Sequence, residues 1–121
     1  MEIGAKSTST LVVTEQLTAA VMGSGDLPVL ATPAMIALME NAAMMSVAEA
    51  LPEDQTTVGS LMNASHLKPT AVGDTVVATA TLVAAEGRKL TFRVEAHDSE
   101  GLIGEGDHVR YIVSREKFLA K

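Results

Sequence analysis

The chain has 121 residues, of which 47% are hydrophobic and 20% charged, a balance that suits one globular domain and excludes a disordered chain. Its net charge of −6 argues against a nucleic-acid partner, because binding to phosphates needs clustered lysine and arginine. The absence of cysteine excludes disulfides, thiolate metal sites and a cysteine nucleophile.

The first third of the chain is predicted to contain a strand and a loop. The N-terminal residues "MEIGAKSTST" lack the apolar stretch of a signal peptide, so we expect a cytoplasmic protein. Residues 6–13 alternate in the manner of a strand. The segment "TEQLTAAVMGSGDLPVL" carries a short helical turn followed by Gly23, Gly25 and Pro28, which is typical of a loop or lid.

A long apolar helix is predicted over residues 33–51. Thr32 can cap this helix, and Pro33 fits its first position, where no N–H is needed. Of these 19 residues, 14 are Ala, Met, Ile, Leu or Val, so the helix is either buried or spans a membrane. The polar residues Glu40, Asn41 and Glu49 argue against a membrane partner. We therefore expect a buried helix.

Four strands are predicted after the helix, over residues 57–68, 75–85, 89–97 and 102–114. Alternation is clearest in the third, where one face carries Leu90, Phe92, Val94 and Ala96. The short connections predict neighbouring antiparallel strands, and hence a four-stranded meander.

The element order predicts an α+β protein in which an antiparallel sheet wraps around one central helix, within a single domain over residues 1–121. This arrangement is the hot-dog fold. One sheet leaves part of the helix and at least one sheet edge uncovered. Pairing with a second copy of the chain would cover both. A homodimer with sites near its interface is therefore expected.

Three residues are candidates for catalysis. Glu40 lies in an otherwise apolar helix, where a carboxylate can act as base, acid or nucleophile, although a solvated helix surface would also explain it. Thr32 would stand at the helix N-terminus, which favours a developing oxyanion. His66 ends a strand beside the helix, where a lone histidine is more often structural or exposed than catalytic, and the case for catalysis rests on its setting "NASHLKPTAVGD".

Spacing limits how these candidates can cooperate. Thr32 and Glu40 are separated by about 12 Å along a helix and point about 80° apart. One imidazole cannot easily bridge both, so the groups either act separately on one substrate or combine two subunits. The other histidines, His97 and His108, show no metal-ligand spacing and are interpreted as structural or exposed. No metal site is predicted.

The positions of Thr32, Glu40 and His66, together with the stretches "ATPAMIALMENAA", "VGSLMNASHLKPTAVGDTV", "EGRKLTFRVEAHD" and "GEGDHVRYIV", resemble the hot-dog acyl-CoA thioesterases, and most of all their fluoroacetyl-CoA thioesterase group. The resemblance covers nearly the whole chain. It implies that Thr32 engages the thioester, that Glu40 acts as nucleophile or general base, and that His66 assists by proton transfer and orientation.

The resemblance also implies two substrate-binding residues, Gly59 against the acyl group and Arg110 near the substrate channel, an exposed strand arginine being an equally good reading of Arg110. It implies an acyl-CoA substrate and no cofactor. One departure is clear, because the family's fluoroacetyl enzyme has aromatic residues before the helix that gate the acyl pocket, whereas here "VMGSGDLPVL" has none.

Three functions follow as hypotheses. The first is hydrolysis of a small or medium acyl-CoA. The second is a hot-dog dehydratase or hydratase, although its usual histidine precedes the acidic helix residue, whereas here Glu40 precedes His66. The third is a protein that binds acyl-CoA without turnover.

Overall fold

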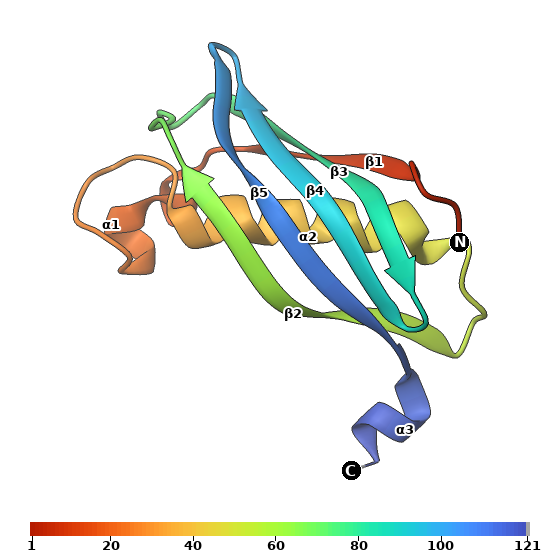
Figure 1. Ribbon diagram of the computed structural model, residues 1–121. Coiled ribbons are helices and arrows are strands. Elements are labelled where there is room, and N and C mark those ends of the chain that lie inside the picture. The colour runs from red at the N-terminus through yellow and green to blue at the C-terminus, as the bar shows by residue number, and fades with distance from the viewer. Residues whose placement is uncertain (121) are drawn as a thin grey trace.

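A curved five-stranded antiparallel sheet packs against one long helix in the computed structural model, which describes residues 1–120 (Figure 1). This arrangement confirms the predicted α+β hot-dog fold. The strands are β1 (Lys6–Val12), β2 (Gln55–His66), β3 (Thr75–Glu86), β4 (Lys89–Asp98) and β5 (Gly101–Ser114). The helical elements are η1 (Glu15–Leu17), α1 (Ala19–Met22), the central α2 (Thr32–Ala48) and α3 (Arg115–Leu119).

The strand order is β1-β3-β4-β5-β2, so the predicted four-stranded meander is wrong in one place. Strands β3, β4 and β5 are neighbours as expected, but β2 pairs with β5 instead of β3. The reason is that β1 pairs with β3 along its whole length and leaves only the far edge of β5 open. The connection over residues 67–74 is long enough to carry the chain between the two edges.

Helix α2 begins one residue earlier and ends three residues earlier than predicted. Ala31 is the N-cap residue and Thr32 is already helical, so the prediction that Thr32 caps the helix is wrong. At the other end, Ala50 N–H donates to the Val47 carbonyl at 3.1 Å and Leu51 N–H to the Ala48 carbonyl at 3.3 Å. These three-residue spacings describe a tighter final turn instead of continued α-helix.

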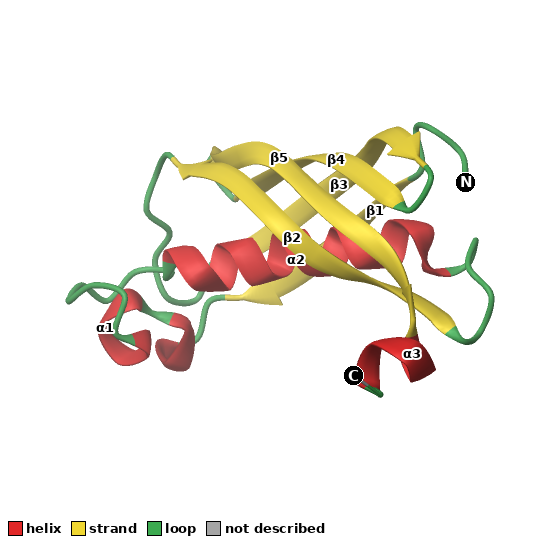
Figure 2. Cartoon of the chain, turned by 60° about the horizontal axis from the view of Figure 1, so that its bottom comes forward, coloured by secondary structure: helices red, strands yellow, loops and turns green. Residues whose placement is uncertain are grey.

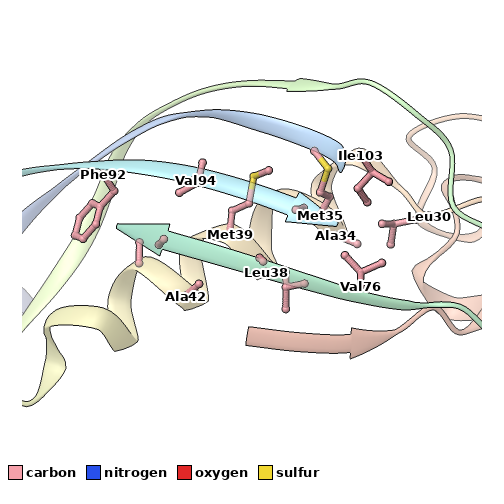
Figure 3. Close-up of a cluster of buried hydrophobic side chains, with 14 of the residues drawn as sticks. Leu30, Ala34, Met35, Leu38, Met39, Ala42, Val76, Phe92, Val94 and Ile103 are labelled. Atoms are coloured by element: carbon pink, nitrogen blue, oxygen red, sulfur yellow. The ribbon is translucent and has the colours of Figure 1, made fainter. Parts of the chain in front are cut away.

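The core lies between α2 and the inner face of the sheet (Figure 3). Figure 3 shows Met39 of α2 directed towards β4 beside Val94, and Met35 beside Ile103 of β5. The alternation predicted for β4 is confirmed, because its inward residues are fully buried: Leu90, Phe92, Val94 and Ala96. With so few aromatic residues, methionine fills much of this space.

One side of α2 is not covered by the sheet. Ala37, Asn41 and Met45 recur at four-residue intervals along that side and are exposed. Figure 2 shows α1 beyond the N-terminal end of α2 and α3 near the opposite end of the molecule. None of the helices within residues 1–120 is long and apolar enough to cross a membrane.

Candidate active site

Glu40 projects from the middle of α2 towards β2, where Gly59 faces it. A Cβ atom built on Gly59 would lie 3.0 Å from Oε2 of Glu40, closer than side chains normally approach. The same position would lie 3.2 Å from Cε1 of His108 and 3.4 Å from Nη1 of Arg110. Three polar side chains therefore converge on the place where Gly59 has none.

The local geometry of β2 explains why this point is open. The pairing of β2 with β5 shifts register between Gly59 and Leu61, as a β-bulge does, and the extra residue is Ser60. Gly59 has no positive φ, so the missing side chain, and not an unusual backbone, is what the position requires. The predicted substrate-binding glycine thus lies beside the predicted catalytic glutamate.

Arg110 is the register partner of Gly59 on β5, and only 7% of it is exposed. Its Nε donates to Oγ1 of Thr57 at 2.7 Å, and its Nη2 donates to the Thr57 carbonyl at 2.9 Å. Burial lowers the pKa of Arg110, and the Glu40 carboxylate opposes that shift. The alternative reading of Arg110 as an exposed strand residue is therefore wrong.

His108 is fully buried two residues before Arg110, so of the two predicted alternatives, structural or exposed, the exposed one is excluded. Its Nδ1 lies 2.7 Å from the Leu61 carbonyl, and its Nε2 lies 3.2 Å from Nη1 of Arg110. His97, by contrast, is exposed on β4.

Glu40, Gly59 and Arg110 form one centre of the candidate site, and Thr32 and His66 form a second. The Thr32 hydroxyl oxygen lies 2.7 Å from Nδ1 of His66 and joins the start of α2 to the end of β2. Nε2 of His66 is buried without a hydrogen bond to any described residue. Burial lowers the pKa of His66, and an interaction with the Lys68 backbone offsets part of that shift. This histidine therefore favours its neutral form, which can accept a proton.

The two centres open into different cavities. The Thr32–His66 pair lines one of about 260 Å³, together with Leu30, Lys68 and Pro69 among others. Glu40, Gly59 and Arg110 line another of about 390 Å³. Thr32 and Glu40 are about 12 Å apart along the helix, and seven residues of extended strand, about 23 Å, separate Gly59 from His66. Within one chain the three predicted catalytic residues do not meet.

Sequence reasoning missed Thr57 and the setting of His108. Alternation along β5 was the available signal, because Gly104, Gly106, His108 and Arg110 share its buried face. Thr57 carries no comparable signal, since only the fold shows that Arg110 needs a partner there. Among residues 1–120, no group of three or more His, Asp or Glu side chains is arranged to hold a metal ion.

The fold and these two centres define a hot-dog thioesterase. A solved thioesterase superfamily member from Thermus thermophilus superposes with a TM-score of 0.90 at 31% identity, over 98% of this chain and 88% of that one. The solved fluoroacetyl-CoA thioesterase FlK superposes with a TM-score of 0.92 at 35% identity, over 99% of this chain and 93% of that one. A variant of FlK has also been solved in complex with fluoroacetate and CoA.

The sequence comparisons narrow the class to one family. The family model of the fluoroacetyl-CoA-specific thioesterases matches residues 13–116. The fluoroacetyl-CoA thioesterase of Streptantibioticus cattleyicolor is 41% identical over 93 residues, which are 77% of this chain and 67% of that protein. The chain belongs to the fluoroacetyl-CoA-specific thioesterase family.

Proposed function

We propose that this member of a thioesterase family hydrolyses the thioester of a small or medium acyl-CoA. Water adds to the thioester carbonyl, the C–S bond breaks, and the products are the free acid and the CoA thiol. The observation that carries the proposal is the carboxylate of Glu40 at an opening shared with Gly59 and Arg110. The complex of the relative FlK with fluoroacetate and CoA supports the substrate class.

Glu40 would supply the attacking oxygen in one of two ways. As a general base it takes a proton from water, which then attacks the carbonyl. As a nucleophile it attacks directly, forms a mixed anhydride and expels CoA thiolate, and water then hydrolyses the anhydride. Arg110 would stabilise negative charge on the substrate in either case, because Nη1 faces the same opening.

Thr32 and His66 would serve the carbonyl and the leaving group. The Thr32 hydroxyl, at the N-terminus of α2, would engage the thioester carbonyl. Neutral His66 can exchange protons through the Thr32 hydroxyl, with which it shares the 2.7 Å hydrogen bond. No cofactor beyond the CoA of the substrate is needed for these steps.

We further propose that the working set combines two copies of the chain in a homodimer. The separation of Glu40 from the Thr32–His66 pair supports this, since one small carbonyl cannot reach both centres of one chain. β2 forms one edge of the sheet, its outer side pairs with no strand of residues 1–120, and Leu61 on it is 51% exposed. A second copy at this edge would bring its own helix N-terminus towards Glu40.

The acyl group is proposed to differ from fluoroacetyl. Residues 19–30, before α2, contain no aromatic side chain that could close over a very small acyl group. Three of the apolar side chains there, Val21, Met22 and Leu27, are exposed, whereas Leu30 at the end of the segment is buried. An open pocket of this kind would accept acyl chains longer than two carbons.

Release of free thiol from a panel of acyl-CoAs tests the reaction, and the chain has no cysteine to add background. We expect release that depends on Glu40, so Glu40→Gln should lower kcat by about 100-fold or more. Glu49→Gln changes an exposed glutamate of the same segment and is the matched control. Binding of every acyl-CoA without thiol release would instead support a non-catalytic binding protein.

Two further measurements test whether Glu40 is nucleophile or general base, and whether the site combines two copies of the chain. In single-turnover hydrolysis in ¹⁸O-labelled water, label in Glu40 shows that the carboxylate is the nucleophile and that water attacks the Glu40 carbonyl of the anhydride, whereas a general base leaves Glu40 unlabelled. Co-expression of Glu40→Gln with Thr32→Val chains tests the composite site. Mixed dimers would regain activity, because one of their two sites would be intact, whereas sites within single chains would stay impaired.

A further inference from the structure

The partners of His108 determine its protonation state. The Leu61 carbonyl can only accept a hydrogen bond, so Nδ1 of His108, 2.7 Å away, must carry a proton. The Arg110 guanidinium can only donate, so Nε2 of His108, 3.2 Å from Nη1, must present its lone pair. The imidazole is therefore the neutral Nδ1–H tautomer, with both ring nitrogens occupied.

Only some of the N–H donors of Arg110 are used by Thr57 and His108, and the others stay available to a ligand. Thr57 takes one N–H from Nε and one from Nη2, and His108 takes one from Nη1. One N–H of Nη2 and the second N–H of Nη1 remain, and Nη1 is the nitrogen that faces the opening beside Gly59. Because the guanidinium is planar, this Nη1 donor is oriented by the two bonds to Thr57 together with the bond of its sister N–H to His108.

The surroundings keep His108 in this role. Its ring packs against Phe92, with ring centroids 6.1 Å apart, and is fully buried. Burial lowers the pKa of His108, the Leu61 carbonyl opposes the shift, Arg110 adds to it, and Glu40 opposes it. The charged groups that face it are thus Arg110 of β5 and Glu40 of α2. Protonation would remove the acceptor of Nη1 and set two cations against each other.

We propose that His108 is a positioning residue, whose neutral Nδ1–H imidazole orients the Nη1 group of Arg110 towards the substrate at the opening formed by Gly59 and Glu40. The substrate-binding consequence rests on the function proposed above, whereas the tautomer and the orientation of Arg110 do not. His108 acts through Arg110, and nothing in the proposal requires it to touch the substrate.

Two variants separate positioning from packing. His108→Asn places an amide N–H near the Leu61 carbonyl but offers no acceptor to Arg110, whereas His108→Gln places an amide oxygen within reach of Nη1 and gives up the bond to Leu61. We expect His108→Asn to raise KM for the best acyl-CoA by about tenfold or more, with kcat within about threefold of wild type. His108→Gln should keep KM within about threefold.

The exposed histidine provides the control, since His97→Asn should change neither constant. A merely structural role predicts that both His108 variants lose stability and activity together, without a difference in KM between them. That result would overturn the proposal.

Nuclear magnetic resonance provides a readout that needs no substrate. Long-range ¹H–¹⁵N correlations at pH 7 should show His108 as the Nδ1–H tautomer, and the Arg110 Nε–H should exchange faster with water in His108→Asn than in His108→Gln. An Nε2–H tautomer, an imidazolium, or equal exchange in the two variants would overturn the proposal. If wild type releases no thiol from any acyl-CoA, the proposed function fails, and these spectra alone decide the inference.

Discussion

The hydroxyl oxygen of Thr32 lies 2.7 Å from Nδ1 of His66, 34 residues further along the chain. This bond explains why Thr32 does not cap α2, since its side chain turns to β2 and Ala31 occupies the cap position without a side-chain bond. A helix start that gives up its cap loses about 1 kcal/mol of stabilisation. The hydroxyl is therefore committed to the histidine.

Replacing the Thr32 hydroxyl should lower kcat strongly and the free energy of unfolding only slightly. Thr32→Val keeps the shape of the side chain but removes the bond to His66, so we expect kcat to fall about tenfold or more. Thr32→Ser retains the hydroxyl and should stay within about threefold. Thiol release measures both, and Thr10→Val on exposed β1 is the control. Wild-type turnover in Thr32→Val would remove Thr32 from the mechanism.

Gly59→Ala should impair activity while leaving the fold intact. The new methyl group would press on Oε2 of Glu40 and on His108 and Arg110, and the side chains of all three would have to shift by a few tenths of an ångström. We expect a loss of about tenfold in kcat/KM, because small displacements at a reacting centre are costly. Ser60→Ala, at the adjacent bulge residue, should be silent. Equal kinetics for the two variants would contradict the crowding seen around Gly59.

Stability should decrease as the pH is lowered below neutrality. Burial lowers the pKa of His66 and of His108, so between the unfolded value of about 6.5 and the lower native values the unfolded chain binds more protons. The free energy of unfolding therefore falls as pH drops through this window. We expect a lower urea midpoint at pH 5.5 than at pH 7.5.

The histidine origin of this effect can be isolated. The double variant His66→Gln, His108→Gln should show a smaller difference in urea midpoint between the two pH values. His97→Gln, at the exposed histidine, should retain the wild-type difference. An unchanged pH dependence in the double variant would assign the effect to other groups.

The pairing of β2 with β5 depends on two small residues, and we expect their replacement to have unequal effects. A Cβ on Gly106 would overlap the backbone of Asn63 and Ala64, whereas one on Gly104 would meet the flexible end of Met35, with its sulfur at 2.5 Å, and only the Ser65 carbonyl oxygen of the backbone, at 2.9 Å. Gly106→Ala should therefore destabilise by about 3 kcal/mol and Gly104→Ala by about 1 kcal/mol. Urea unfolding measures both, and the reverse order would show that Met35 cannot move.

Much of this protein follows from local pattern alone. Alternation in residues 89–97 and the continuous apolar run after Pro33 predict the strand and the helix, because each depends on which residues repeat along the chain. The position of Glu40 in that run marks the candidate site for the same reason. A carboxylate needs a physical reason to stand among apolar residues, and that reason is visible in the sequence.

Only the tertiary structure decided the strand order and the partners within the site. Strand β1 occupies one edge of β3, and this long-range pairing sends β2 to β5 and sets Gly59 opposite Arg110. No local pattern reports which edges remain open once distant strands have paired. The bond from Thr32 to His66 likewise joins side chains that meet only because the sheet folds over α2, and the bond from Arg110 to Thr57 exists only because β2 pairs with β5.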